Sequence, residues 1–244
     1  PRRIFYGWWL VGVAGFMLTL MAVSVFQGIG TLLVGLERHF GWSRTAMSGA
    51  FALARVEGAV LGPIEGFLID RYGSRRLVLI GYVIMGVGFL MFSRVDALWQ
   101  FYVAFLVITL GGGLGGWLAN IALVNNWFDR RRSFAMAVAM SGIHVGGFLV
   151  PILAFGIDSH GFRWATLGIG VFLLAIVGPV AKVIRNRPED YGMRPDGAPA
   201  ARPQPDQVQA EPDLESEPDF TVVQALRTPV FYIITVAQIS SSVS

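Results

Sequence analysis

Three ionisable side chains, Arg55, Glu57 and Glu65, lie within an otherwise apolar stretch of sequence between Arg44 and Asp70. The stretch is long enough to cross a lipid bilayer as a helix, because about 20 residues at ~1.5 Å per residue span the hydrocarbon. Glu57 is the midpoint of the stretch, and Arg55 lies just before it. A charge at that depth costs about 2.5–3.5 kcal/mol on insertion scales, so these residues are expected to bind a solute or a proton.

Arg55 and Glu57 are predicted to have different partners. At ~100° per residue they point ~200° apart on a helix and cannot pair with each other. Arg55 shares a helical face with Gly58, Gly62 and Gly66, a ladder of small residues along which another helix can approach closely. We therefore expect Arg55 to pack against a neighbouring helix, and Glu57 to face a cavity as the better candidate for carrying a proton. The alternative is that both side chains only tie helices together.

The other candidate residues are polar and lie in later or earlier apolar stretches. His144 is placed near the middle of its stretch, where an imidazole can carry a proton near neutral pH or can hydrogen-bond to a neighbouring helix. Ser141 is three residues earlier, but no acidic residue or nucleophile elbow accompanies the pair, so an enzyme active site is not predicted. Gln27 and Asn120 could bind a polar solute or bridge two helices. Glu65, nearer the end of its helix, is expected to act in a gate or to extend toward the headgroups.

The composition indicates a membrane protein. Of 244 residues, 54% are hydrophobic and 14% are charged, against roughly a quarter charged in an ordinary soluble domain. The apolar residues come in separate blocks, each of about the length of a spanning helix. The six blocks are residues 8–36, 45–69, 77–92, 98–124, 134–157 and 164–181. The sequence therefore predicts an all-α, multi-pass membrane protein built on a six-helix bundle.

Three segments are predicted along the chain. Residues 1–184 form the six-helix bundle. Residues 185–228 are rich in proline and acidic side chains and are predicted to be a disordered cytoplasmic linker. Residues 229–244 begin a seventh, incomplete spanning helix, so the sequence is expected to be part of a longer chain.

The short segments between the blocks differ in charge on the two sides of the membrane. One side carries fourteen of the 19 basic residues, and the other carries four. The fourteen are Arg2, Arg3, Arg71, Arg75, Arg76, Arg130, Arg131, Arg132, Lys182, Arg185, Arg187, Arg194, Arg202 and Arg227. Because basic residues stay in the cytoplasm, the amino terminus and the linker are predicted to be cytoplasmic. Arginine greatly outnumbers the single lysine, which favours a bacterial inner (plasma) membrane.

Several other kinds of site are not supported. A net charge of +3 and a pI near 9.6 would suit nucleic-acid binding, but the arginines lie in short clusters between apolar blocks, where lipid headgroups are the expected partner. The chain has no cysteine, and no metal or cofactor site is predicted. The glycine run 111–113 has no accompanying lysine, so it is expected to serve helix packing or bending and not phosphate binding.

The segment 66–76 reads GFLIDRYGSRR. It resembles the signature between the second and third helices of the major facilitator superfamily, G-x-x-x-D-R-x-G-R-[RK]-[RK]. The matching residues are Gly66, Asp70, Arg71, Gly73, Arg75 and Arg76. The resemblance implies a cytoplasmic gate, with Gly66 in a close helix contact and the last two arginines at the anionic leaflet. Ser74 stands where the family usually has arginine, so one charge contact of this gate is in question.

Four further segments are similar to the monocarboxylate-transporter-like branch of that superfamily. They are Tyr6-Gly7-Trp8-Trp9, Phe40-Gly41-Trp42-Ser43-Arg44, Trp127-Phe128 with Arg131-Arg132, and Pro188-Glu189-Asp190-Tyr191-Gly192. The resemblance implies the amino-terminal half of a twelve-helix secondary transporter that works by alternating access. It also implies a small organic solute, with a monocarboxylate as the suggested class, moved together with a proton. A missing carboxyl-terminal six-helix half would supply the other wall of the cavity.

Two departures from the family patterns keep alternatives open. The first helix has no lysine of the kind associated with carboxylate binding in animal members of the branch, and Gln27 lies near that position. The arginine of helix four and the Gly-Pro pair of helix five that are typical of proton-antiporter drug exporters are also absent. The alternatives are an exporter of another class of small molecule and a non-transporting sensor or structural protein with the same fold.

Overall fold

The computed structural model describes residues 5–197, and every regular element within them is a helix. The elements of the bundle are α1 (Tyr6–Met21), the π-helix η1 (Ala22–Phe26), α2 (Ile29–Phe40), α3 (Arg44–Tyr72), α4 (Ser74–Phe92), α5 (Leu98–Gly115), α6 (Trp117–Asn125), α7 (Arg132–His160) and α8 (Phe162–Val183). The first crossing is made of α1, η1 and α2, and the fourth of α5 and α6. The six expected crossings are therefore present, and the predicted all-α, multi-pass fold is confirmed.

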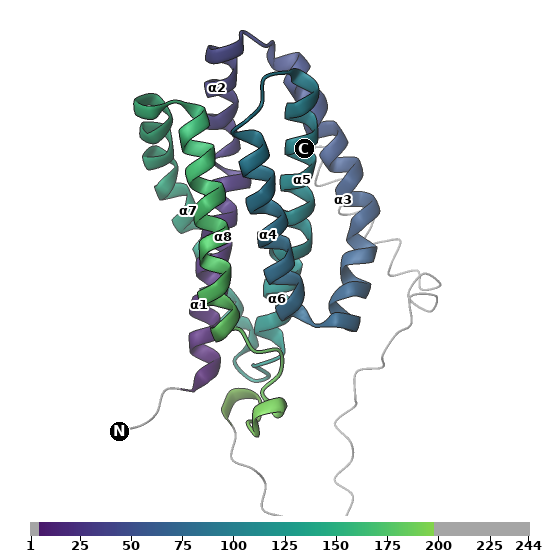
Figure 1. The fold of residues 1–244 in the computed structure, drawn as a ribbon. Coiled ribbons are helices and arrows are strands. Elements are labelled where there is room, and N and C mark those ends of the chain that lie inside the picture. The colour runs from purple at the N-terminus through teal and green to yellow at the C-terminus, as the bar shows by residue number, and fades with distance from the viewer. Residues whose placement is uncertain (1–4, 198–244) are drawn as a thin grey trace, which may run out of the picture. The chain divides into compact units, whose positions relative to one another are not determined.

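Successive crossings run in opposite directions and are joined by short connections (Figure 1). Three of these connections contain a glycine with positive φ: Gly41 (68°), Gly73 (80°) and Gly161 (83°). Side chains of L-residues rarely adopt this backbone, so glycine allows one helix to end and the next to begin within a few residues. Because the six crossings alternate in direction, the start of α1 and the end of α8 lie at the same end of the bundle. The turn between α3 and α4 lies at that end too.

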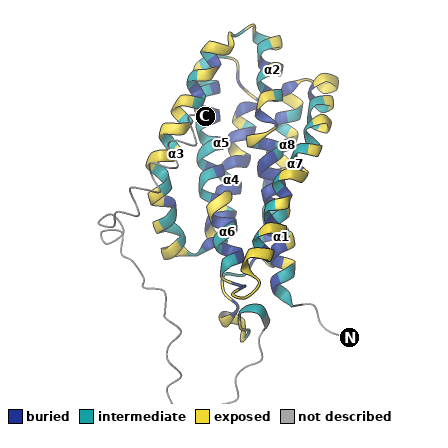
Figure 2. Ribbon diagram, turned by 180° about the vertical axis from the view of Figure 1, so that it is seen from behind, coloured by how far each residue is buried: buried dark blue, intermediate teal, exposed yellow. Residues whose placement is uncertain are grey.

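Five of the crossings are long and apolar enough to span a membrane by length and composition. The exception is α3, which has 29 residues but carries Arg55, Glu57 and Glu65. It buries only Met47, Ala50 and Glu65 among its residues, and its ribbon is largely exposed or half-exposed in Figure 2. The α3 helix, which carries the charged side chains at membrane depth, therefore has little contact with the rest of the described bundle.

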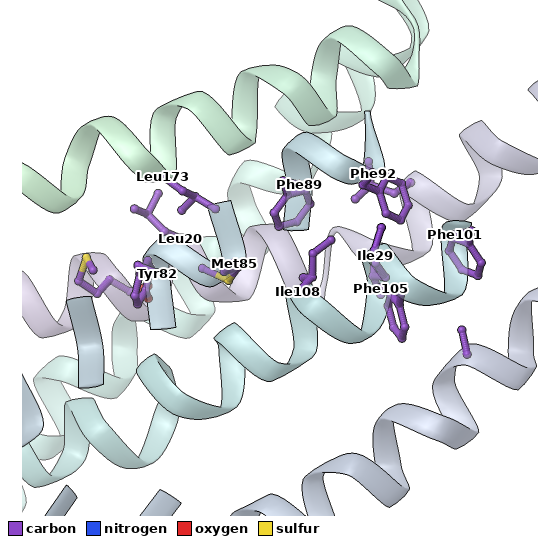
Figure 3. Close-up of a cluster of buried hydrophobic side chains, with 14 of the residues drawn as sticks. Leu20, Ile29, Tyr82, Met85, Phe89, Phe92, Phe101, Phe105, Ile108 and Leu173 are labelled. Atoms are coloured by element: carbon purple, nitrogen blue, oxygen red, sulfur yellow. The ribbon is translucent and has the colours of Figure 1, made fainter. Parts of the chain in front are cut away.

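The centre of the bundle is α4, which packs against α5 and α8. Its side chains Tyr82 and Phe89 are buried and join Ile108 of α5 and Leu173 of α8 in the cluster shown in Figure 3. The buried Tyr82 hydroxyl donates a hydrogen bond to the carbonyl oxygen of Met17 in α1. This bond satisfies a polar group that would otherwise be unpaired in an apolar core.

Glycines bring the backbones of α4 and α5 into contact. A Cβ atom added at Gly81 would lie against the backbone of Gly115 and 2.6 Å from the carbonyl oxygen of Gly111. A Cβ atom at Gly115 would lie 2.8 Å from the carbonyl oxygen of Val78. Close approach at small residues is how membrane helices gain packing energy where the lipid is as apolar as the side chains. The packing role predicted for the glycine run 111–113 is confirmed at Gly111, and Gly115 makes a similar contact.

Residues 185–197 belong to the ordered bundle, and their assignment to a disordered linker is wrong. They include two short 3₁₀ helices, η2 (Glu189–Tyr191) and η3 (Pro195–Gly197). The remaining linker residues, 198–228, and the predicted seventh helix, 229–244, lie outside the described residues. The end of the bundle therefore extends beyond the predicted boundary at residue 184.

Contacts to α1 and to the connection between α6 and α7, together with one contact inside the segment, hold this segment in place. The Arg185 guanidinium carbon lies 4.3 Å from the ring centroid of Tyr6 and 4.1 Å from that of Tyr191. Asp196 Oδ2 accepts hydrogen bonds from the backbone N–H groups of Asp129 (3.0 Å) and Arg130 (2.6 Å). A cation between two aromatic rings and a carboxylate accepting two backbone donors are both favourable contacts. They explain why a segment rich in proline and charge is ordered.

Substituting Gly81 by alanine is expected to destabilise the bundle by roughly 1–3 kcal/mol, because the added methyl group forces α4 and α5 apart. The measurement is the midpoint of thermal unfolding of the purified full-length protein in detergent. Gly168→Ala in α8 is the control, since a Cβ atom there would meet nothing within 4 Å. Equal midpoints for the two variants would contradict the glycine contact.

Candidate functional site

Glu57 is held by a neighbouring helix. Thr109 Oγ1 on α5 donates a hydrogen bond to Glu57 Oε2 at 2.6 Å. The same hydroxyl lies 3.1 Å and 3.0 Å from the carbonyl oxygens of Phe105 and Leu106, one turn earlier on its own helix. The bond ties the middle of α3 to the middle of the fourth crossing and leaves the Glu57 side chain half-buried.

Arg55 is exposed on another face of α3. No ion pair within residues 5–197 involves its guanidinium. A Cβ atom at Gly58, Gly62 or Gly66 would contact nothing within 4 Å, so no described helix approaches along this ladder. The expected packing of Arg55 is therefore wrong for the part of the chain that the structure describes. Glu57, in contrast, ties α3 to α5 through Thr109, and its predicted role in carrying a proton stays a prediction.

Glu65 is buried, with 9% of its surface exposed, although the sequence predicts a gate or headgroup position for it. Its carboxylate lies so close to Gly113 of α5 that a Cβ atom there would collide with Oε1. It lines a cavity of about 320 Å³ between α3, the fourth crossing and the first crossing. The other lining residues are Met21, Val25, Phe26, Thr109, Gly112, Gly113, Trp117 and Leu118. Glu65 is the charged side chain of an otherwise mostly apolar lining.

Two broken helices flank this cavity. In the first crossing, α1 gives way to η1 (Ala22–Phe26) and to a bend at Gln27 and Gly28 before α2 begins. A Cβ atom at Gly28 would collide with the carbonyl oxygen of Val23, so this bend requires glycine. In the fourth crossing, Gly116 (φ −86°, ψ −116°) separates α5 from α6. Breaks of this kind are frequent where membrane helices form binding sites.

Asn120 supports the break in the fourth crossing. Its side-chain amide donates to the carbonyl oxygens of Gly115 (2.9 Å) and Gly116 (2.7 Å), and the residue is fully buried. Its Oδ1 has no hydrogen-bond partner among the described residues. The side chain thus satisfies carbonyl groups that the break frees. Both bonds stay within the fourth crossing, so the described contacts of Asn120 do not bridge two helices, and its predicted role in binding a solute stays a prediction.

Gln27 and His144 lie in the same region, although the sequence gave no reason to place them together. Gln27 Nε2 donates to the carbonyl oxygen of Ile143 on α7 at 3.3 Å, and so bridges the first and fifth crossings. His144 is the next residue and is exposed. The Ser141 hydroxyl donates to the carbonyl oxygen of Val138 at 2.7 Å and not to His144. The imidazole is therefore accessible on this face of α7.

The signature segment 66–76 forms the turn between α3 and α4. The backbone N–H of Arg75 donates to Asn186 Oδ1 (2.8 Å), and its guanidinium donates to the carbonyl oxygen of Ala181 (2.7 Å). Arg75 is thus bound to the end of α8 and does not extend to lipid headgroups as expected. Ser74, at the position where the family usually has arginine, is buried at 1% exposure. The other charged residues of the signature are exposed: Asp70, Arg71 and Arg76.

The opposite end of the bundle carries the ion pairs found within residues 5–197. They are Arg38–Asp158 (3.0 Å), Arg44–Glu37 (2.9 Å) and Arg163–Asp96 (2.5 Å). Arg38 and Asp158 line a second cavity, of about 630 Å³, which reaches Gln27 between α2 and α7. This end also contains the predicted segment 40–44, where Ser43 accepts a hydrogen bond from the N–H of Ala46 and so caps α3.

The fold and the site define a class of protein. A bundle of six membrane crossings, with two helices broken around a cavity and charged groups at that depth, is typical of solute transporters. A sequence profile of the Major Facilitator Superfamily matches residues 6–243. The chain therefore belongs to the Major Facilitator Superfamily.

Individual relatives are transporters by name. The MFS-type transporter pynF of Aspergillus niger is 29% identical over 199 residues, which is 77% of this chain and 44% of that protein. Monocarboxylate transporter 11 of Mus musculus is 28% identical over 183 residues, 73% of this chain and 40% of that protein. The Fujikurins efflux protein of Gibberella fujikuroi is 30% identical over 128 residues, 52% of this chain and 28% of that protein. The chain spans less than half the length of these relatives, and the resemblance to monocarboxylate transporters is confirmed.

Replacing Thr109 by valine is expected to lower the stability of the bundle by about 1–3 kcal/mol. The reason is that the carboxyl group of Glu57 loses its donor inside the protein while the shape of the side chain is kept. Thermal unfolding of the full-length protein in detergent measures the loss. Thr109→Ser keeps the hydroxyl and is the matched control; a valine variant that unfolds at the wild-type midpoint would contradict a stabilising role of this hydrogen bond.

Proposed function

We propose that the chain is the amino-terminal half of a secondary active transporter that moves a small organic solute across a membrane by alternating access. The proposed solute class is a monocarboxylate, moved in the same direction as a proton. Membership of the superfamily and the names of the relatives support transport, and these relatives are not enzymes. The observation that carries the proposal is the exposed guanidinium of Arg55 at the middle of a membrane crossing.

The chemistry of Arg55 supports an anionic solute. A guanidinium presents planar pairs of N–H donors that fit a carboxylate with two parallel hydrogen bonds. A charged side chain at that depth is costly unless a polar or charged partner offsets the cost. We propose that the partner of Arg55 is the carboxylate of the solute, held between this half and a second six-helix half. Gln27, with His144 beside it, would add hydrogen bonds on the facing side of such a cavity.

The acidic residues of α3 support coupling to a proton. Glu57 and Glu65 lie in the same crossing as Arg55, and both are at least half-buried. A carboxyl group away from water can alternate between a charged and a neutral form as the transporter changes conformation. Transport would then require both the proton and the solute to be bound before the cavity changes sides.

The excess of basic residues at one end of the bundle supports an orientation. The signature 66–76, the 130–132 cluster and the start of α1 all lie at that end, which we propose faces the cytoplasm. The signature would act there as a gate, with Arg75 anchored on α8 and Asp70, Arg71 and Arg76 available to a second half. The arginine-rich composition supports a bacterial inner membrane as the location.

Substituting Arg55 by glutamine is expected to raise the KM for a monocarboxylate by about 10- to 100-fold. A charge-assisted hydrogen bond contributes about 1.5–3 kcal/mol, and 1.4 kcal/mol is one factor of ten. Uptake of radiolabelled pyruvate, lactate and acetate into proteoliposomes containing the full-length protein measures the change. Arg55→Lys keeps the charge without the planar pair of donors and should fall between the two. An unchanged KM in the glutamine variant would contradict a role in binding the solute.

A pH gradient, acidic outside, is expected to drive accumulation of the solute, and a protonophore is expected to abolish it. The double variant Glu57→Gln, Glu65→Gln should lose this response, because no carboxyl group of α3 remains to take up the proton. The same proteoliposomes, preloaded with unlabelled solute, measure exchange without a gradient. Accumulation that ignores the gradient in the wild type, or that keeps its response in the double variant, would contradict coupling through α3.

Export of another class of small molecule is the second candidate. It is supported by the relative named as the Fujikurins efflux protein, which is 30% identical over 128 residues. In right-side-out vesicles an exporter would lower the internal concentration of its solute, and a proton symporter would raise it. A protein of the same fold that acts only as a sensor or as a structural component would leave the internal concentration of the solute unchanged.

A further inference from the structure

We propose that Glu65 is the residue that binds the coupling proton, in the 320 Å³ cavity between the two broken helices. The inference rests on the proposed proton symport and identifies the site at which that proton is held. The sequence points to Glu57 for this task, because Glu57 is the midpoint of the helix. The surroundings of the two carboxyl groups favour Glu65.

The first argument is the difference in hydrogen bonding between the two residues. Glu57 already accepts a hydrogen bond from Thr109 at 2.6 Å. Glu65 is nine-tenths buried and has no hydrogen-bond or ion-pair partner among the described residues, although its carboxyl group lies at the cavity wall. A buried charge without a partner is costly, and a bound proton removes the charge. Glu65, the carboxyl group without a partner, is therefore the one whose negative charge a bound proton would neutralise.

The second argument is the composition of the wall, which fits a proton better than a metal ion. A bound metal cation needs about six oxygen ligands at fixed distances. Besides Glu65, the described lining contains the hydroxyl of Thr109, which is engaged with Glu57, and is otherwise made of apolar side chains and glycines. A proton needs only one carboxylate oxygen. The residues that line the cavity therefore favour binding of a proton over binding of a metal cation.

The third argument is the place of the cavity between parts that can move. Met21, Val25 and Phe26 of its wall belong to the end of α1 and to η1, and Gly112, Gly113 and Trp117 lie on both sides of the break at Gly116. Broken helices allow their two halves to tilt separately, which is how discontinuous helices serve transport. A proton on Glu65 would change the charge at the point where these halves meet.

Few other charged groups act on Glu65. The ionisable side chains of the helices packed against α3 are Arg75, Arg76 and Tyr82 of α4, and Tyr102 of α5. The hydroxyls of both tyrosines donate to backbone carbonyls, and the two arginines are in the first turn of α4, at the end of the bundle. Neither α6 nor η1 has an ionisable residue. On α3 itself, Glu57 lies about two turns before Glu65, and Asp70 and Arg71 lie in the last turn of the helix.

The test compares two measurements on the same proteoliposomes of the full-length protein, with pyruvate, lactate and acetate as probes. One measurement is accumulation driven by a pH gradient, and the other is exchange against internal unlabelled solute without a gradient. The variants are Glu65→Gln and Glu65→Asp. Glu37→Gln is the matched control, because it removes the same charge from a residue that pairs with Arg44 at the end of the bundle.

The expected result is that Glu65→Gln reduces gradient-driven accumulation to the level without a gradient and keeps exchange within about twofold of the wild type. Glu65→Asp keeps part of the response, and Glu37→Gln keeps all of it. Accumulation that still responds to the gradient in Glu65→Gln would overturn the inference, as would loss of exchange together with accumulation, which marks a structural or solute-binding role. Absence of exchange in the wild type would instead count against the proposed transport itself.

Discussion

Inside a bilayer, every backbone N–H and C=O group has to find its partner within the protein, and the rest of this structure follows from that constraint. It makes the crossings helical and allows a break only where other groups restore the lost hydrogen bonds. At Gly116 the side chain of Asn120 does so, by donating to two carbonyl oxygens. At Gln27 the backbone N–H reaches the carbonyl oxygen of Ala22 at 2.8 Å, which keeps the π-helix closed. Residues next to both breaks line the cavity that contains Glu65, so the irregular backbone is found where it can serve a site.

The helices are held against their neighbours by different kinds of contact. Glycines let α4 and α5 touch along their backbones, and large apolar side chains fill the core around them. In contrast, α3 is tied to α5 by two hydrogen bonds, from Thr109 to Glu57 and from Tyr102 to the carbonyl oxygen of Ala46 (2.5 Å). It leaves Arg55 and its glycine ladder uncovered within residues 5–197. The α3 helix is thus held in place although most of its residues lie outside the core. This arrangement suits a helix that lines a cavity better than one with a purely structural role.

Three of the four short motifs, those at 6–9, 127–132 and 188–192, meet at one end of the bundle. Tyr6 of the first motif lies 5.5 Å from the ring of Trp127 in the third, and Arg185 stacks between Tyr6 and Tyr191 of the last. The Trp127 indole N–H donates to the carbonyl oxygen of Arg185 at 3.1 Å. Residues that are more than 120 positions apart in the sequence thus form one cluster. The cluster closes the end of the bundle that also carries the 66–76 signature.

The sequence by itself determined the class of fold, the number of crossings and the residues at membrane depth, because these depend on the length and position of the apolar blocks. It also identified the superfamily through the signature 66–76. It could not determine which face of α3 is covered, since a helical wheel gives the directions of side chains and not their neighbours. For that reason Arg55 was expected to pack against a helix that Glu57 contacts instead. The order of residues 185–197 was missed because proline and charge indicate disorder unless distant partners such as Tyr6 are known. The tertiary structure alone decided that Asn120 supports a helix break and that Glu65 is buried in a cavity, because both facts depend on contacts between helices far apart in the chain.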